Sequence, residues 1–212
     1  MITPDLSQII LFLSATLLLN LTPGADVLYI ASRSFSQGKR YGVIAAFGIS
    51  SGIVIHVIIT AFGVGEIFQY SPLAFWILKL VGATYLAYLG WKSFFSQESI
   101  FQKVNQSSKG SAFKTYMGGI LTTVLNPKVI LFFITFLPQF VDTTKGHVMS
   151  QLFFLGGLFI VSGTFVNLFY VFFLSLFKDL IFKSRKVALA FQRITGVLFG
   201  TLACKLLLAE SR

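Results

Sequence analysis

The sequence predicts an all-α membrane protein with six transmembrane helices, arranged as two inverted repeats of three helices. Of the 212 residues, 55% are hydrophobic and only 11% are charged, and the mean hydropathy is +0.82. Charged residues make up about 25% of an average soluble domain, so this chain could not cover its apolar surface as a soluble globule. The apolar residues also gather in six segments, and a helix needs about 20 such residues to cross a bilayer. The segments are 6–32, 42–65, 73–95, 113–137, 148–177 and 187–209.

The basic residues set the predicted orientation. They concentrate in the first, third and fifth connections between the segments, whereas the second has none and the fourth has only Lys145. Lysine and arginine accumulate in cytoplasmic loops, so these three connections are expected in the cytoplasm and both termini outside. The net charge of +10 is therefore a topology signal and does not indicate nucleic-acid binding. The residues are Arg33, Lys39 and Arg40; Lys92, Lys103, Lys109 and Lys114; Lys178, Lys183, Arg185, Lys186 and Arg193.

An internal repeat divides the chain. Residues 1–95 form the predicted first three-helix repeat, 96–112 a polar cytoplasmic linker, and 113–212 the second repeat. Three is an odd number, so the second half enters the membrane from the opposite side, as in many secondary transporters. The matched motifs are Thr22-Pro23-Gly24 with Asn126-Pro127-Lys128, Ser51-Gly52 and His56 with Ser162-Gly163 and Asn167, and Lys79 and Gly82 with Arg193 and Gly196.

Each half carries a proline motif inside its first apolar segment. Thr and Asn are good N-cap residues, and proline is favoured at the first helical position. Thr22-Pro23 and Asn126-Pro127 are therefore interpreted as fresh helix starts within the membrane. Such starts expose N–H groups and a positive dipole end, so two of them could bind a carboxylate. The alternative is that both are ordinary proline kinks that only shape packing.

Two charged residues lie well inside the apolar segments. Asp26 follows Pro23 by three residues, and Lys128 follows Pro127 directly. A charge at mid-membrane costs about 2.5–3.5 kcal/mol and usually marks a pathway or relay. The alternative for Asp26 is that it only caps the second half-helix. The other lysines of the segments, Lys79 and Lys205, lie near the outer ends and are expected to snorkel to the interface.

His56 is the only histidine inside a span. Histidine changes charge near neutral pH, so His56 and Asp26 are candidate members of a proton relay. The alternative is that His56 is a packing residue with its hydrogen bonds satisfied. Its repeat counterpart, Asn167, would keep the hydrogen bonding without carrying a proton.

The sequence does not favour an enzyme. Gly48 to Gly52 match the G-x-S-x-G nucleophile pattern, but that pattern needs a strand-turn-helix context, and here it lies within a predicted helix. Ser50 and His56 are six residues apart and do not share a helix face. The small-residue pairs Gly48/Gly52 and Gly196/Gly200 are interpreted as sites of close helix packing. One Cys and two distant His cannot form a zinc site, and no metal or cofactor is predicted.

Several motifs, spread in order over nearly the whole chain, resemble the RhtB/LysE amino-acid exporter family. The family usually has Thr-Pro-Gly-Pro where this chain has Thr-Pro-Gly-Ala, so Ala25 departs from the pattern. The motifs are Thr22-Pro23-Gly24-Ala25-Asp26, Arg33 with Gly38, Gly48 to His56, Gly82 with Tyr85-Leu86 and Leu89-Gly90, and Asn126-Pro127-Lys128 with Phe132-Phe133 and Leu137-Pro138-Gln139-Phe140.

The resemblance implies a multi-pass exporter of amino acids or their derivatives in a bacterial inner membrane, driven by proton entry. The Thr-Pro-Gly form is more similar to the homoserine/threonine branch, which favours a neutral substrate. The expected partners are an amino acid, protons and the lipid bilayer, and homo-oligomerisation is left open. In the expected mechanism, Lys128 and the two half-helix starts (Thr22, Pro23, Gly24; Asn126, Pro127) hold the substrate carboxylate. Asp26 holds the ammonium or exchanges it for a proton. A passive channel and a structural membrane protein remain alternatives.

Overall fold

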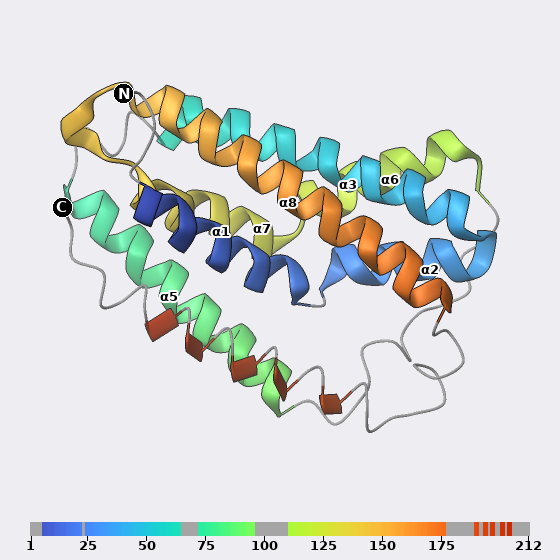
Figure 1. The fold of residues 1–212 in the computed structure, drawn as a ribbon. Helices are drawn as coiled ribbons and strands as arrows, with labels where there is room; N and C mark the ends of the chain where they lie inside the picture. Colours follow the sequence, from blue (N-terminus) through green and yellow to red (C-terminus); the bar gives the residue numbers. More distant parts are fainter. Residues whose placement is uncertain are drawn as a thin grey trace.

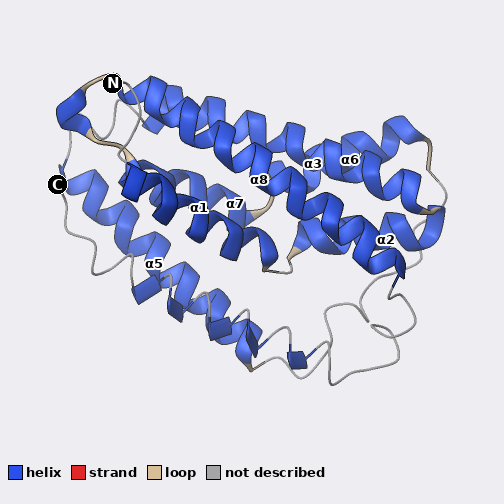
Figure 2. Cartoon of the chain, viewed as in Figure 1, coloured by secondary structure: helices blue, strands red, loops and turns tan. Residues whose placement is uncertain are grey.

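The computed structural model describes residues 6–22, 24–64, 72–95 and 110–176, with parts of 189–204, and this portion is helical without strands (Figures 1 and 2). The first part of the chain forms α1 (Leu6–Leu21), α2 (Ala25–Gln37), α3 (Lys39–Ile59), which continues as the π-helical turn Thr60–Val64, and α5 (Pro72–Phe94). The second part forms α6 (Ala112–Val124) and α7 (Pro127–Leu131), which continues as the turns Phe132–Phe136 and Leu137–Phe140. The short turn Thr143–Lys145 and α8 (Val148–Leu176) follow.

Two of these helices are single, long and apolar enough to cross a membrane, namely Lys39–Gly63 and Val148–Leu176. Two further spans are broken helices: α1 and α2 meet at a bend of 50°, and α6 meets Pro127–Phe140 at 49°. The described residues thus hold two to four candidate spans. The predicted segment 73–95 is helix α5, whereas 96–109 of the linker and most of 187–209 lie outside the described residues, as do the side chains of Lys79 and Lys205. The six-helix inverted arrangement stays a prediction.

The interior is built around α3, which packs against α2, α6 and α8. Small residues allow this approach: a Cβ added to Gly52 would lie 2.9 Å from the carbonyl oxygen of Ile120, and Gly48 is packed against Tyr116. The predicted close packing at Gly48 and Gly52 is confirmed. Gly196 likewise packs against Gly90 of α5, at 2.7 Å from an added Cβ to its carbonyl oxygen. At Gly200, by contrast, a Cβ would meet no atom of the described residues within 4 Å, so the predicted close packing is not found there.

Ser50 has a structural environment that fits its place inside a helix. Its hydroxyl donates to the carbonyl of Ala46 (3.1 Å) and shares a hydrogen bond with the hydroxyl of Thr164 on α8 (2.7 Å). The G-x-S-x-G pattern thus lies within α3 rather than at a strand-to-helix turn. This agrees with its interpretation as a packing motif.

A cluster of phenylalanines fills the interior on the side of the 132–140 turns. The rings of Phe132 and Phe133 each lie 5.0 Å from that of Phe159 on α8, and Phe12 lies 5.2 Å from Phe140. Aromatic pairs at these separations pack closely and exclude water. The cluster therefore forms an apolar block on one side of the two helix breaks.

Large apolar side chains also cover much of the outside. On α8 they include Phe165, which is 70% exposed, together with Phe169 and Phe172. A soluble monomer rarely exposes a continuous apolar surface of this extent. The surface suits contact with lipid, in agreement with the predicted membrane protein.

Candidate functional site

The first helix break lies between α1 and α2. Helix α2 begins at Ala25 after Gly24, which has an extended backbone and no side-chain cap. The hydroxyl of Thr22 instead donates backwards to the carbonyl of Leu18, at 2.8 Å. The predicted break is confirmed, but Thr22 was wrongly interpreted as its N-cap, because its hydroxyl completes the preceding helix. Pro23 lies outside the described residues.

The second helix break has the construction that the sequence predicts. The side-chain oxygen of Asn126 accepts a hydrogen bond from the backbone N–H of Lys128 (3.1 Å), and Pro127 is the first residue of α7. Asn126 is thus a genuine N-cap, and the proline costs nothing at a position where its missing N–H would have no helical partner.

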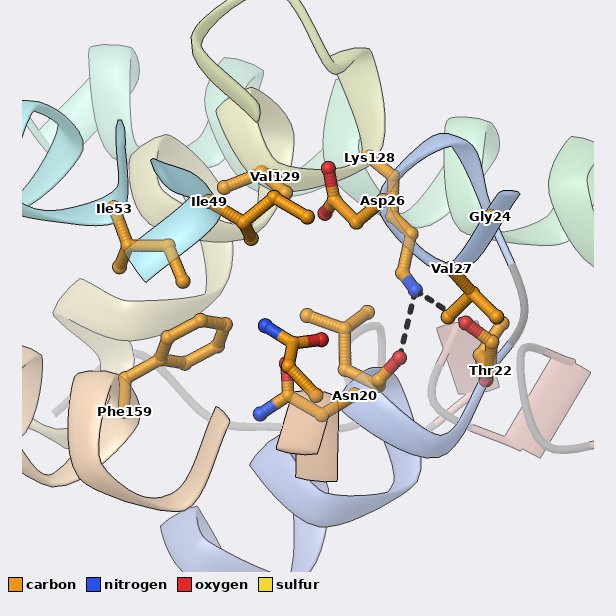
Figure 3. Close-up of a pocket in the computed structure, with 12 residues that line it drawn as sticks. Asn20, Thr22, Gly24, Asp26, Val27, Ile49, Ile53, Lys128, Val129 and Phe159 are labelled. Carbon is orange, nitrogen blue, oxygen red and sulfur yellow. Dashed lines mark hydrogen bonds between the residues drawn. The ribbon is translucent and has the colours of Figure 1, made fainter. Parts of the chain in front are cut away.

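Lys128 connects the second break to the first. Its ammonium Nζ donates to the carbonyl oxygens of Leu19 (2.7 Å) and Thr22 (2.8 Å), at the end of α1 (Figure 3). Tyr170 of α8 donates its hydroxyl to a third carbonyl there, that of Leu21, at 2.6 Å. The last carbonyls of a helix lack helical partners and carry partial negative charge, so a cation is well placed among them. This role of Lys128 is not predictable from the sequence, because α1 supplies only backbone atoms.

Asp26 is bound from the opposite half of the chain. Its carboxylate accepts hydrogen bonds from the hydroxyl of Thr123 (2.9 Å) and from the side-chain amide of Asn126 (3.2 Å). Asp26 also lies in the first turn of α2, where the helix dipole favours a negative charge. Both hydrogen-bond donors come from the second break, so Asp26 does more than satisfy the start of its own helix.

His56 belongs to the same polar network. Its ring nitrogen Nε2 lies 3.1 Å from the carbonyl oxygen of Thr123, and its ring stacks on that of Phe133 with centroids 5.6 Å apart. A carbonyl oxygen can only accept a hydrogen bond, so Nε2 carries the proton. Thr123 thus connects His56, through its carbonyl, with Asp26, through its hydroxyl. His56 is buried and does not line the cavity described next.

A cavity of about 20 Å³ lies where the two breaks meet (Figure 3). This volume admits a water molecule but is far below the roughly 300–1,000 Å³ of small-ligand pockets, so the site is closed to larger molecules in this conformation. Four predicted polar residues line it, namely Thr22, Asp26, Lys128 and Asn167. A fifth polar residue, Asn20, was not predicted from the sequence. The lining residues are Leu19, Asn20, Thr22, Gly24, Asp26, Val27, Ile49, Ile53, Lys128, Val129, Phe159 and Asn167.

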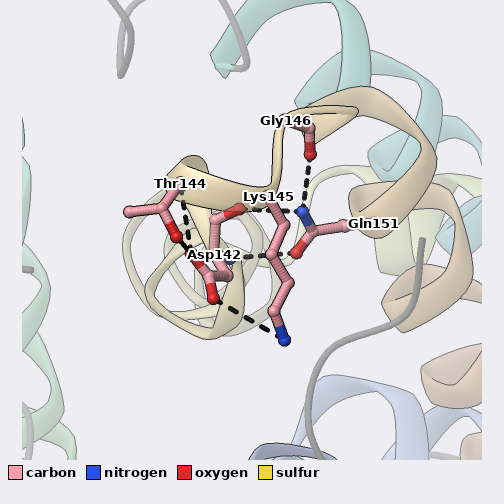
Figure 4. Close-up of polar contacts among 5 residues, drawn as sticks. All are labelled: Asp142, Thr144, Lys145, Gly146 and Gln151. Atoms are coloured by element: carbon pink, nitrogen blue, oxygen red, sulfur yellow. Dashed lines mark hydrogen bonds and ion pairs between the residues drawn. The ribbon is translucent and has the colours of Figure 1, made fainter. Parts of the chain in front are cut away.

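The far end of the second broken helix is anchored by a turn (Figure 4). Buried Gln151 accepts from the backbone N–H of Asp142 (2.9 Å) and donates to the carbonyls of Asp142 (2.9 Å) and Gly146 (2.8 Å). The hydroxyl of Thr144 donates to the Asp142 carboxylate, and Lys145 lies 3.8 Å from it. These contacts, the Thr144 hydroxyl first, lower the pKa of Asp142.

The comparison with known proteins identifies the family. The sequence matches the family described as LysE type translocator over residues 17–210. The chain belongs to the LysE type translocator family. The resemblance stated from the motifs is thus confirmed, and a translocator is a transporter rather than an enzyme.

Three curated relatives of this LysE-type chain are membrane or efflux proteins by name. An uncharacterized membrane protein of Bacillus subtilis (strain 168), YrhP, is 31% identical over 83% of this chain and 87% of its own length. A leucine efflux protein of Salmonella choleraesuis (strain SC-B67) is 28% identical over 94% of both chains. An uncharacterized membrane protein of Vibrio cholerae (serotype O1, El Tor Inaba N16961) is 27% identical over 68% of this chain and 69% of its own. No solved structure matches the chain.

Proposed function

We propose that the protein exports amino acids with neutral side chains across a bacterial inner membrane, in exchange for protons. The observation that carries the proposal is the meeting of two broken helices at one cavity, which is lined by a carboxylate and an ammonium group. An amino acid is a zwitterion, and such a pair is complementary to its two charges. Membership of the LysE family and the similarity to a leucine efflux protein support the same function.

Asp26 and Lys128 divide the recognition of the zwitterion. Asp26 accepts the substrate ammonium group, which displaces part of its contact with Thr123 or Asn126. Lys128 and the start of α2, where Gly24 provides no side-chain cap, supply positive potential for the carboxylate. The rest of the lining combines aliphatic residues and Phe159 with the uncharged polar residues Asn20, Thr22 and Asn167, and it offers no charged partner to a charged side chain. A neutral substrate fits this environment.

Asp26 also couples transport to protons. A carboxylate that holds an ammonium group must lose its proton, and the departure of the substrate leaves it free to be protonated again. His56 is the next titratable group of the network, connected to Asp26 through Thr123. A proton that enters from outside can therefore be carried by His56 and by Asp26 as it passes the cavity.

The two halves of the chain provide alternating access. Residues 1–95 and 113–212 act as inverted repeats joined by the cytoplasmic linker 96–112, with both termini outside. The nearly equal bends of 50° and 49° at the two breaks support this symmetry. Rocking of one half against the other opens the closed cavity to each side in turn.

Transport by purified protein in proteoliposomes tests this function. With an imposed pH gradient, wild-type protein should move labelled leucine against its concentration gradient, and dissipating the gradient should stop this movement. Asp26→Asn should lower the gradient-driven rate by about 10-fold or more, because a neutral amide neither holds an ammonium group strongly nor takes up a proton. Asp142→Asn is the matched control outside the cavity and should transport like wild type.

His56→Gln separates proton movement from substrate binding. Glutamine can still donate to the carbonyl of Thr123 but cannot carry a proton. Gradient-driven uptake should fall, whereas exchange of leucine for leucine, which needs no net proton movement, should persist. Movement of leucine only down its own gradient would indicate a channel. The absence of amino-acid transport by well-folded wild-type protein would disprove the proposed function.

A further inference from the structure

We infer that Asn20 of α1 and Asn167 of α8 form the subsite that recognises the carboxylate of the transported amino acid. The inference rests on the proposed export function and adds two binding residues to it. Both side chains line the cavity, together with Asp26 and Lys128. In the view of Figure 3, Asn20 lies across the cavity from Asp26.

The hydrogen-bonding state of these two amides suits the binding of a hydrogen-bond acceptor. The Nδ2 atom of Asn20 is buried and has no hydrogen-bond partner. Asn167 is only 7% exposed, and in the described part of the chain its side chain makes no hydrogen bond. Buried polar groups are nearly always paired, because desolvation without a partner is costly. The Asn20 amide thus has a buried donor without an acceptor, and the Asn167 amide, on the same cavity, has no hydrogen bond within the described residues.

Gly163 of α8 leaves room for the Asn20 amide to pack against this helix. It precedes Asn167 by four residues, so both lie on one helix face. A Cβ on Gly163 would lie 3.3 Å from Nδ2 and 3.5 Å from Oδ1 of Asn20. A methyl group at this position would therefore require the amide to shift by a few tenths of an ångström, and glycine leaves it room beside Asn167.

The charge distribution favours an anion at this place. Lys128 donates its ammonium to the carbonyl of Leu19, the residue directly before Asn20. The positive charge is thus held next to the two amides, and hydrogen bonds to a charged group are the stronger ones. A carboxylate here would accept from both amides, while Asp26 across the cavity holds the ammonium. The remaining walls, with Ile49, Ile53 and Phe159, are left for an apolar side chain.

The experiment compares leucine with isoamylamine, which has the same carbon skeleton and ammonium group but no carboxylate. Apparent KM for leucine transport and inhibition by isoamylamine are measured for wild type, Asn20→Asp and Asn167→Asp. Each substitution keeps the shape and replaces a donor by a negative charge. We expect the KM for leucine to rise by about 10-fold or more while isoamylamine inhibits as well as before or better.

Gly163→Ala provides a second variant in case the acidic ones fail to fold. The added methyl forces a small shift of the Asn20 amide without introducing a charge, so the KM for leucine should rise several-fold with inhibition by isoamylamine unchanged. Unchanged KM values for leucine in folded variants, or equal losses for leucine and isoamylamine, would overturn the inference and mean that the amides hold only water. If wild-type protein transports no amino acid, the proposed function itself is wrong.

Discussion

The two broken helices bend by nearly the same angle, 50° and 49°, yet they are completed by different means. At the second break, the cap is local: Asn126 binds the N–H of Lys128, two residues further on. At the first, α2 starts after Gly24 without a side-chain cap, and the carbonyls that end α1 are bound by Lys128 and Tyr170 from the other half.

This difference shows how the two halves hold each other. Lys128, at the second break, donates its ammonium group to a carbonyl at the end of α1. Thr123 and Asn126, also at the second break, donate hydrogen bonds to Asp26 at the start of α2. We therefore expect the first break to depend on the second for its shape. The second break keeps its own cap, so we expect it to be the more independent of the two.

Lys128→Met should have the largest effect on stability. It removes two charge-assisted hydrogen bonds from the carbonyls of Leu19 and Thr22, and so should lower the free energy of unfolding by about 3–5 kcal/mol. Unfolding in mixed micelles measures this loss, and Lys114→Met at an exposed position of α6 is the matched control. If both variants are equally stable, the first break does not depend on the second.

The next prediction compares the two residues that were both interpreted as caps. Asn126→Ala loses a true cap and one donor to Asp26, so unfolding should become easier by about 2–4 kcal/mol. Thr22→Val loses one hydrogen bond within its own helix, with an expected cost of about 0.5–1.5 kcal/mol. The same unfolding assay ranks them. A larger loss for Thr22→Val would reverse the distinction between the breaks.

The smallest effect concerns the turn beyond the second broken helix. The pKa of Asp142 is lowered in the folded protein, so its stabilising contribution is complete above the unfolded pKa, near 3.8, and is lost as the pH falls through the lower folded pKa. Stability measured between about pH 5 and pH 2 should therefore fall more steeply for wild type than for Asp142→Asn. Superimposable acid curves would show that this turn contributes no pH dependence.

The sequence predicts those parts of the site that are encoded by neighbouring residues. Asn126-Pro127 is a local start signal and is found as one, and the polarity of Asp26, Lys128 and His56 within apolar segments marks the residues that gather at the network. The partners of Lys128 could not be predicted, because they are carbonyl groups 109 and 106 residues away, and any residue type supplies a carbonyl.

One wrong prediction, for Thr22, and one residue that was not predicted, Asn20, have a similar origin. A threonine hydroxyl can cap a helix such as α2, but α1 continues to Leu21, and the Thr22 hydroxyl donates to a carbonyl of α1 instead. Asn20 could not be singled out from the sequence, since a single amide in an apolar helix is not unusual. Its place at the site depends on α8, which brings Gly163 and Asn167 beside it. Long-range placement of common groups, rather than unusual residues, decides these cases.

The contact from Lys128 to the end of α1 has a consequence for biosynthesis. Thr22 leaves the ribosome 106 residues before the lysine that binds its carbonyl. At about 5–20 residues per second, the first broken helix spends roughly 5–20 s in the membrane without that partner. During this interval the carbonyls of Leu19 and Thr22 lack the ammonium group that binds them in the folded protein, until the fourth segment has been synthesised.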